Sequence, residues 1–320
     1  MNSVLETISR IGIIPVIALS DAEQAVPLAR ALVAGGLPAA EVTFRTAAAA
    51  DAIRAIRAQV PEMLVGAGTV LTHEQLDRAL DAGAGFIVSP GFNPDTVKYG
   101  LSRGALMLPG TATGGEMEQA MALGLEMVKF FPAEQNGGVD KLKALAGPYK
   151  TLKWMPTGGV NAKNLMDYLS FDQIAACGGT WMVKKELIES GNWAEITRLT
   201  REAVQIMLGF ELRHVGINCA DAAAAERTAK LFCTLFGFPY KAGNSSDFAG
   251  SAVECMKAPC LGSRGHIAIG TNSVARAEFH LGLQGAAFDE RTRKTDAKGR
   301  TKAIYLEGEL GGFAVHLVQK

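Results

Sequence analysis

The chain has 320 residues, which is longer than one usual domain and favours two. Its 32 basic residues balance its 32 acidic residues and no run of five like charges occurs, which argues against nucleic acid or an anionic membrane as a partner. The five cysteines are an odd number without C-x-x-C spacing, as is typical of reduced thiols in a cytosolic protein. The apolar N-terminal stretch is too short to span a bilayer and contains Glu6, so we expect a soluble, unprocessed cytoplasmic chain.

Residues 1–208 alternate short apolar runs with Ala-rich stretches that open on a polar cap and often end in Gly, as helices do. Eight such runs in strict alternation with helices, within about 200 residues, predict a small (β/α)₈ TIM barrel. An open doubly wound sheet is the structural rival, but the fingerprint G-x-G-x-x-G is missing after the first run. The expected strands are IIPVIAL, AAEVTF, MLVGAGTV, GFIVSPG, ALMLPGT, EMVKFFP, LKWMPTGGV and QIAACGGTWM.

The second and third expected strands carry polar residues at their ends, where barrels place their active sites. Glu41, Thr43 and Arg45 are spaced two apart, which places all three side chains on one face of the second strand. The third strand ends in GAGTV, where glycines permit close approach of a ligand and Thr69 offers a hydroxyl. A plainer alternative is that Glu41 and Arg45 only pair with each other.

The sixth expected strand contains Lys129 inside the apolar run MVKFFPA. An unpaired buried charge is costly, so this position needs either a partner or a chemical use for a neutral amine. A desolvated lysine has a lowered pKa and attacks a ketone to form an imine. Glu41 is then a candidate general acid/base and Arg45 a candidate ligand for the carboxylate of a 2-keto acid. The alternative is a solvated or ion-paired lysine with no catalytic role.

The seventh and eighth expected strands end in PTGGV and CGGTW. The paired glycines Gly158, Gly159, Gly178 and Gly179 are expected to free backbone N–H groups for an anion, and Thr180 adds a hydroxyl. Barrels commonly bind phosphate in the loops after strands 7 and 8. A lone pair of glycines is otherwise just a turn. Together the strand ends predict an enzyme that holds a 2-keto acid as an imine at one end and a phosphate at the other.

The motifs EVTFRT, GAGTV, VSPG, VKFFPAEQNGG, PTGGV and CGGTW occur in this order over nearly all of residues 1–208. On these motifs the chain resembles the class I 2-keto-3-deoxy-6-phosphogluconate aldolases, which also cleave 4-hydroxy-2-oxoglutarate. The resemblance implies a 2-keto acid phosphate as substrate, no metal or other cofactor for the aldolase, and a homotrimer. The site residues it implies are Lys129 as Schiff-base residue, Glu41 as acid/base, Arg45 and Thr69 at the pyruvate carboxylate, Pro90 and Phe131 as pocket walls, and Gly159, Gly179 and Thr180 near the phosphate.

Two positions differ from the commonest family pattern, because Phe44 stands where a leucine is usual and Thr180 replaces a serine. Neither change threatens the chemistry, since Phe44 points away by strand alternation and Thr180 keeps the hydroxyl. Two rival functions stay open for the barrel. One is a sugar-phosphate sensor that kept the pocket, and the other is a phosphate-binding isomerase or epimerase that uses Glu41 without imine chemistry.

The order of elements changes at Glu211, after a joint near Gly209. Residues 211–320 read as a strand, a helix and further strands, twice over, and RHVGIN against GHIAIG weakly indicates an internal duplication. We therefore expect a barrel domain over residues 1–208 and an α+β domain of βαβββ type over residues 211–320.

This second domain resembles the vicinal-oxygen-chelate (glyoxalase-like) superfamily in element order and in the placement of His214, His266 and His316 on three strands. The resemblance implies a divalent metal such as Zn²⁺, Fe²⁺ or Mn²⁺, with Glu254 as a candidate fourth ligand. The alternative is three ordinary hydrogen-bonded histidines. The domain is expected to be a second enzyme, a ligand-sensing module or a structural piece, and the lack of a carboxylate at His316 favours the last two.

Overall fold

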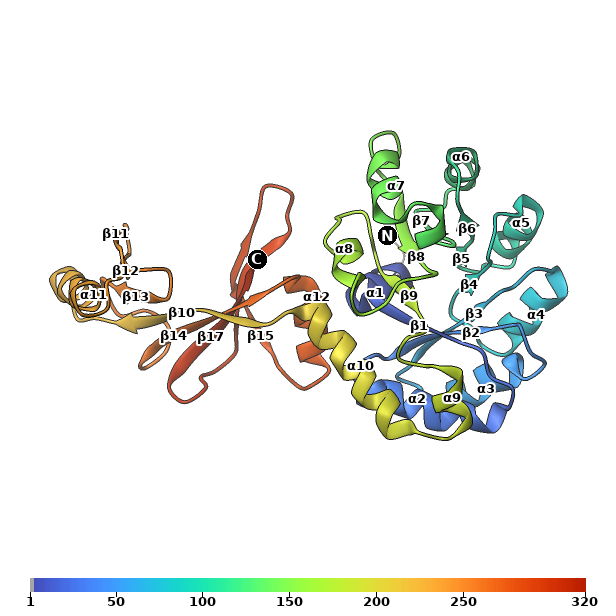
Figure 1. Cartoon of the computed structure of the whole chain (residues 1–320), viewed down its shortest axis with the longest axis horizontal. Helices are drawn as coiled ribbons and strands as arrows, with labels where there is room; N and C mark the ends of the chain where they lie inside the picture. The colour runs from blue at the N-terminus through green and yellow to red at the C-terminus, as the bar shows by residue number, and fades with distance from the viewer. Residues whose placement is uncertain (1–2) are drawn as a thin grey trace. The chain divides into compact units, whose positions relative to one another are not determined.

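The structure, a computed structural model, describes residues 3–320. The chain divides into two compact units, Met1–Met207 and Leu208–Lys320. Figure 1 shows the first unit from blue to yellow and the second from golden yellow to red. Within the described residues, no helix is long and apolar enough to cross a membrane.

The first unit is a closed ring of short parallel strands. The strands are β1 (Ile13–Ile17), β2 (Ala39–Thr43), β3 (Leu64–Gly68), β4 (Ile87–Val88), β5 (Met107–Leu108), β6 (Gly110–Thr111), β7 (Met127–Phe130), β8 (Lys153–Pro156) and β9 (Cys177–Gly179). Neighbours pair in chain order, β8 meets β9 through isolated bridges, and β9 closes the ring on β1. Pro109 alone separates β5 from β6, so these two share one position of the ring. The predicted eight-stranded (β/α)₈ barrel is thereby confirmed.

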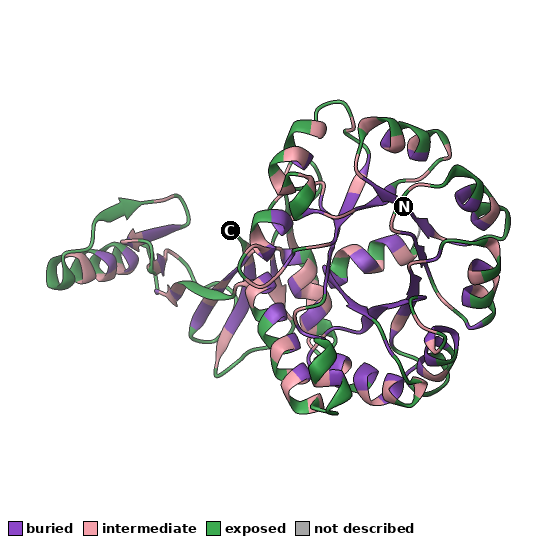
Figure 2. Ribbon diagram, turned by 45° about the vertical axis from the view of Figure 1, so that its right-hand side comes forward, coloured by how far each residue is buried: buried purple, intermediate pink, exposed green. Residues whose placement is uncertain are grey.

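Helices surround this ring, and each presents an apolar face to the strands while its outer face is exposed (Figure 2). Several begin at polar caps: Thr72 caps α4, Asn93 caps α5, and Thr113 with Glu116 forms a capping box on α6. The helices are α1 (Ser3–Ile11), α2 (Ala25–Ala34), α3 (Ala49–Gln59), α4 (His73–Asp81), α5 (Pro94–Ser102), α6 (Gly114–Ala122), α7 (Gly138–Leu145), α8 (Leu165–Leu169), α9 (Lys185–Glu189) and α10 (Trp193–Leu208), with 3₁₀ turns η1 (Ala22–Gln24) and η2 (Glu134–Asn136).

The second unit is one eight-stranded mixed sheet with two helices. Its elements are β10 (Glu211–Asn218), α11 (Ala222–Phe236), β11 (Tyr240–Ala242), β12 (Ser246–Ala249), β13 (Val253–Met256), β14 (Gly265–Thr271), α12 (Val274–Gly282), β15 (Phe288–Thr295), β16 (Thr301–Leu306) and β17 (Phe313–Gln319). The strand order β11-β12-β13-β10-β14-β17-β16-β15 is the same four-strand arrangement twice, joined where β10 pairs antiparallel with β14. The element order therefore matches the predicted duplication.

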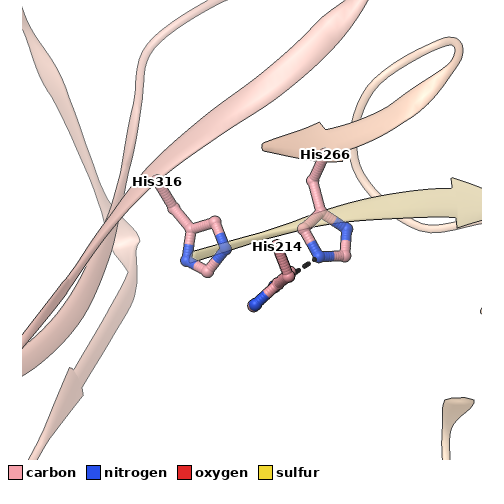
Figure 3. Close-up of side chains that lie close together, drawn as sticks. All are labelled: His214, His266 and His316. Carbon is pink, nitrogen blue, oxygen red and sulfur yellow. Dashed lines mark hydrogen bonds between the residues drawn. The ribbon is translucent and has the colours of Figure 1, made fainter. Parts of the chain in front are cut away.

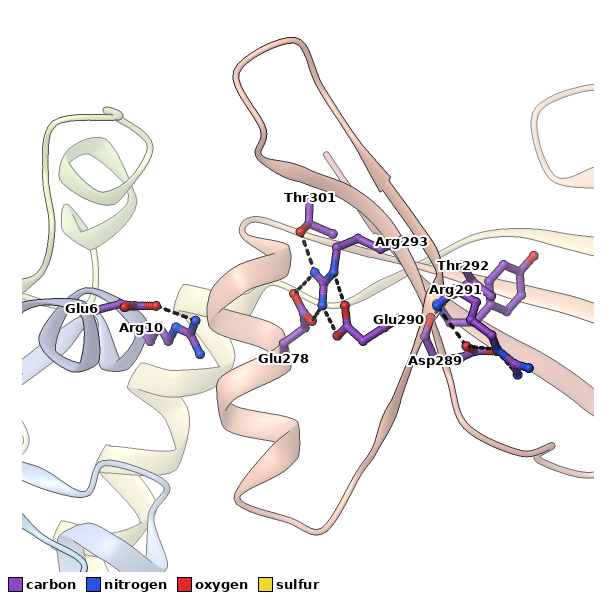
Figure 4. Close-up of polar contacts among 10 residues, drawn as sticks. Glu6, Arg10, Glu278, Asp289, Glu290, Arg291, Thr292, Arg293 and Thr301 are labelled. Atoms are coloured by element: carbon purple, nitrogen blue, oxygen red, sulfur yellow. Dashed lines mark hydrogen bonds and ion pairs between the residues drawn. The ribbon is translucent and has the colours of Figure 1, made fainter. Parts of the chain in front are cut away.

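Each helix of the second unit covers the strands of its own half: α11 packs on β12 and β13, and α12 packs on β16 and β17. Under α11 the packing is apolar, because Ala225 and Ala229 lie against Cys255. The second half adds a polar network in which Arg293 of β15 donates to Glu278 of α12 at 2.7 Å and to Thr301 of β16 (Figure 4). These contacts leave the opposite face of the sheet free of helices of this unit.

Candidate functional site

A buried ion pair lies inside the barrel between β2 and β7. Lys129 Nζ is 3.1 Å from Glu41 Oε1 and 3.4 Å from Oε2. The side chains are 6% and 0% exposed, so both charges are withdrawn from water. The lysine therefore has a partner, and that partner is the residue expected to act as its acid/base. The alternative pairing of Glu41 with Arg45 does not occur.

Two neighbours fix how this ion pair lies. A Cβ placed on Gly68 of β3 would be 2.1 Å from Glu41 Oε1, so the carboxylate occupies space that only glycine leaves open. On another side, Lys129 Nζ lies 5.2 Å from the centroid of the Phe131 ring. The amine is thus held between a carboxylate and an aromatic wall, an arrangement that limits access of water and favours a reactive, positioned nucleophile.

Thr69 directly follows β3, and Arg45 lies two residues beyond the end of β2, the strand paired with β3. Arg45 is exposed and, in the described part of the chain, makes no ion pair or hydrogen bond. Thr69 has φ 56°, the one positive φ of a non-glycine residue among the described residues, which costs of the order of 1–3 kcal/mol. Thr43 differs from both, because its hydroxyl donates to the Ile17 carbonyl at 2.9 Å. Arg45 and Thr69 are therefore free to meet a ligand, whereas Thr43 is occupied.

The loops expected to bind phosphate lie next to each other, since an isolated bridge joins Thr157 to Gly178. Gly158 and Gly159 have φ of 98° and 83°, and within residues 3–320 their N–H groups have no acceptor. Thr180 is exposed and opens the loop after β9.

The second pair of glycines lies at the end of its strand, as expected. Gly178 and Gly179 are the last residues of β9 and pair with Ile14 and Pro15 of β1. Their lack of a side chain has a packing reason, because a Cβ on Gly179 would lie 1.9 Å from the Trp181 ring. The candidate anion cradle is consequently the Gly158–Gly159 turn together with Thr180.

Thr157 is a pocket residue that the sequence reasoning missed. It lies two residues beyond Met155, which is the register partner of Lys129, so it shares the face that Lys129 presents to the interior. The residue is 5% exposed and its hydroxyl has no hydrogen-bond partner among the described residues. Its position in PTGGV, between the strand end and the glycine turn, was the available signal. Pro90 and Phe131, the two predicted wall residues, also follow strand ends and are half-buried.

Comparison with known proteins agrees with this geometry. The sequence profile of the KDPG and KHG aldolases matches residues 4–199. The chain belongs to this aldolase family. Among its relatives, the 2-dehydro-3-deoxy-phosphogluconate aldolase of Treponema pallidum (strain Nichols) is 47% identical over 65% of this chain and 99% of its own length. The KHG/KDPG aldolase of Escherichia coli (strain K12) is 46% identical over 60% of this chain and 91% of its own length.

A relative of known structure was captured with pyruvate bound covalently, at the carbinolamine stage of imine formation. The barrel is similar to a crystal structure of KDPG aldolase from Legionella pneumophila with pyruvate captured at low pH as a covalent carbinolamine intermediate. The TM-score is 0.61 at 38% identity, over 62% of this chain and 97% of that one. The matches to these aldolases thus account for the first unit and leave about a third of the chain outside.

Outside the aldolase match, the structure brings together the three predicted histidines of the second unit (Figure 3). They come from β10, β14 and β17, and each offers a ring nitrogen within 4.8 Å of the others. His214 Nε2 and His266 Nε2 are 3.2 Å apart. Glu254 Oε2 of β13 lies 3.1 Å from each of these two nitrogens. Four potential metal ligands therefore converge on one face of the sheet.

The electrostatics of this cluster keep Glu254 and His316 in forms that bind metals. Burial raises the pKa of Glu254, but its hydrogen bonds with His214 and His266 outweigh that effect and hold the pKa well below the usual range. Burial, helped by the two neighbouring histidines, lowers the pKa of His316 to about 3. Both ring nitrogens of His316 are buried without a hydrogen-bond partner among the described residues. A carboxylate and a neutral, unpartnered imidazole are the forms that bind divalent metals.

Proposed function

We propose that the barrel is a class I, imine-forming aldolase, a carbon–carbon lyase. Its substrates are 2-keto-3-deoxy-6-phosphogluconate, cleaved to pyruvate and glyceraldehyde 3-phosphate, and 4-hydroxy-2-oxoglutarate, cleaved to pyruvate and glyoxylate. The observation that carries this proposal is the buried pair in which Glu41 Oε1 lies 3.1 Å from Lys129 Nζ. The relatives named for these substrates support it, since they match nearly their whole length to this barrel.

Imine formation begins with the proton that the ion pair holds. Glu41 accepts a proton from the Lys129 ammonium across 3.1 Å, which leaves a neutral amine. The amine attacks the C2 carbonyl of the substrate to give a carbinolamine, and loss of water gives the protonated imine. This cation is the electrophile that the later steps need, so the aldolase chemistry requires no metal.

Cleavage then uses the imine as an electron sink. A base removes the proton of the C4 hydroxyl, the C3–C4 bond breaks, and its electron pair moves toward the imine to form an enamine while the aldehyde leaves. Protonation of the enamine at C3 and hydrolysis of the imine release pyruvate and restore Lys129. Glu41 is the group placed to carry these protons, directly or through water.

The remaining pocket residues hold the two ends of the substrate. We assign Arg45 and Thr69 to the carboxylate next to C2, because neither has a partner among residues 3–320 and both lie just beyond adjacent strands. Pro90 and Phe131 act as walls. The phosphate is assigned to the Gly158–Gly159 turn and Thr180, with Gly178 and Gly179 beneath them in β9.

We expect Arg45→Met to raise KM for both substrates by roughly ten- to a hundredfold, since a hydrogen-bonded ion pair with the carboxylate is lost. Pyruvate release, coupled to lactate dehydrogenase, measures this. Arg54→Met is the matched control, because Arg54 is an exposed barrel arginine that pairs with Asp51 on α3. An unchanged KM in Arg45→Met contradicts the assignment, and a wild-type protein that releases no pyruvate from either substrate contradicts the proposed activity.

The two rival functions differ from this one in what the lysine does. A sensor has no use for a reactive amine, and an isomerase that uses Glu41 alone is not inactivated by borohydride in the presence of substrate. The family resemblance also implies that the chain forms a homotrimer. Analytical ultracentrifugation of the purified protein tests this expectation.

We propose, as a second function, that the second unit is a vicinal-oxygen-chelate domain that binds one divalent metal ion through His214, His266, His316 and Glu254. Ligands about 2.1 Å from a metal lie about 3.0–3.4 Å from one another. The separations of 3.1 and 3.2 Å among His214, His266 and Glu254 fit that spacing without rearrangement. Zn²⁺, Fe²⁺ and Mn²⁺ suit such a nitrogen and carboxylate set.

We expect the purified chain to take up one equivalent of Co²⁺, a spectroscopic substitute for these metals, with visible absorption that saturates at that ratio. His214→Ala should lower the affinity at least about 100-fold, because a direct ligand contributes more than the outer groups whose loss costs 10- to 100-fold. His73→Ala is the control, since His73 is a half-exposed histidine at the start of α4. Absence of Co²⁺ binding, or equal binding by the two variants, rules out this centre.

A further inference from the structure

The loops after β7 and β8 interlock at Glu134. Its backbone N–H donates to the Gly158 carbonyl at 3.1 Å, and the preceding Ala133 N–H donates to Thr157 at 2.8 Å. The stem of Glu134 lies directly on the glycine turn, because a Cβ added to Gly159 would be 2.4 Å from Glu134 Cγ. Glu134 therefore supports one side of the turn assigned to phosphate.

Glu134 is itself held by Tyr168 of α8, whose hydroxyl donates to Glu134 Oε1. Tyr168 is 1% exposed, so its ring cannot move without disturbing the packing beneath α8. Burial, followed by this hydrogen bond, raises the pKa of Tyr168, which keeps the hydroxyl protonated and donating. A buried, fixed donor thus determines where an exposed carboxylate lies.

The other side of the turn is held by two amides. Asn161 Nδ2 and Asn164 Nδ2 donate to the Gly159 carbonyl at 2.9 and 3.2 Å. This carbonyl is occupied by these two donors, whereas the N–H groups of Gly158 and Gly159 have no acceptor in the described part of the chain. The turn therefore has its acceptor satisfied and its donors free, which is the state required to bind an anion.

The carboxylate of Glu134 is an unexpected neighbour for a phosphate, because like charges repel. Because Glu134 accepts a hydrogen bond from Tyr168 and lies on the glycine turn, its role is to position that turn rather than to contact the phosphate. Among the described residues, neither of these two forms a hydrogen bond or ion pair with Lys129, which pairs with Glu41. A substrate without a phosphate does not need this turn, so the pair should matter for one substrate and not for the other.

We propose that Glu134 and Tyr168 are a positioning pair that sets the preference for phosphorylated over unphosphorylated 2-keto acids by holding the Gly158–Gly159 turn in its anion-binding conformation. The inference rests on the proposed aldolase function. It adds a specificity determinant that touches the loop rather than the reacting atoms.

The test compares two substrates of the full chain, 2-keto-3-deoxy-6-phosphogluconate and 4-hydroxy-2-oxoglutarate. Tyr168→Phe removes only the hydroxyl, and Glu134→Ala removes both the acceptor and the stem. Each should raise KM for the phosphorylated substrate about tenfold, with kcat and the KM for 4-hydroxy-2-oxoglutarate within about twofold of wild type. Glu134→Gln keeps an acceptor for Tyr168 and should stay within about threefold for both substrates.

Tyr99→Phe is the matched control, because Tyr99 also donates to a carboxylate, Asp77, at 2.8 Å but lies on α5. If KM rises equally for both substrates, or Glu134→Ala changes neither, the positioning role is wrong. Glu134→Ala decides the matter if Tyr168→Phe does not fold, since Glu134 is exposed. Borohydride trapping of pyruvate in the wild-type protein separates the two possible failures. If wild type is trapped but the variants do not discriminate between the substrates, only this inference is wrong. If wild type is not trapped, the aldolase function itself is wrong.

Discussion

Lys129→Ala is expected to lower kcat/KM for both substrates by more than about 10⁴-fold, because it removes the amine assigned to form the imine. The coupled pyruvate assay measures the loss. The variant also leaves Glu41 buried without its partner, so a fall in activity alone does not separate chemistry from stability.

Lys129→Arg provides that separation. A guanidinium keeps the positive charge beside Glu41, but it stays protonated and does not form an imine. We expect this variant to be as inactive as Lys129→Ala while it retains more of the thermal stability of the wild type. Substantial aldolase activity in folded Lys129→Arg protein would falsify the assignment of Lys129 as the nucleophile.

Glu41→Gln is expected to lower kcat by about 10²- to 10⁴-fold, the usual contribution of a positioned general acid or base. The amide has nearly the same shape, so it fits the space over Gly68 that the carboxylate occupies. It neither accepts the Lys129 proton nor returns protons to the enamine. Steady-state kinetics with both substrates measure the effect.

Glu134→Gln is the matched control for this prediction, because it makes the same change at a carboxylate in the loop after β7. It should leave kcat within about threefold of wild type, since Glu134 does not contact Lys129. A kcat for Glu41→Gln that equals that of the control shows that Glu41 is only the structural partner of the lysine.

The barrel was predictable because its signals are local. Each strand is a short apolar run, and the helices between them begin at polar caps such as Asn93 of α5. Strand alternation also placed Glu41 on a definite face of β2. The candidate nucleophile was visible as Lys129, since a charge inside an apolar run needs an explanation.

The pairings within the site were not predictable, because they depend on how distant strands meet. Glu41 and Lys129 are 88 residues apart, and their contact follows from ring closure and from the space above Gly68. Gly178 and Gly179 were expected at the end of the eighth strand, but the motif CGGTW does not reveal that Gly179 packs against the Trp181 ring. The bond between Glu134 and Tyr168 joins two segments that no sequence motif connects.

In the second unit, element order was enough to predict which strands carry the three histidines. Their convergence depends on strand register. The antiparallel pairing of β10 with β14 places His266 opposite Gly216, two residues along β10 from His214. The missing carboxylate at His316 favoured a binding or structural role over catalysis. Glu254, supplied by β13, places a carboxylate in the cluster after all, and so brings an enzymatic role for this unit back into consideration.

The most direct test of the central claim is to add pyruvate and sodium borohydride to the purified protein and to locate the added mass by peptide mapping. Borohydride reduces an imine to a stable secondary amine, so the product records which lysine formed it. The proposed mechanism predicts a reduced pyruvyl adduct on the peptide that contains Lys129, and none in Lys129→Arg. A folded wild-type protein with no adduct, or with the adduct on another lysine, would contradict the account.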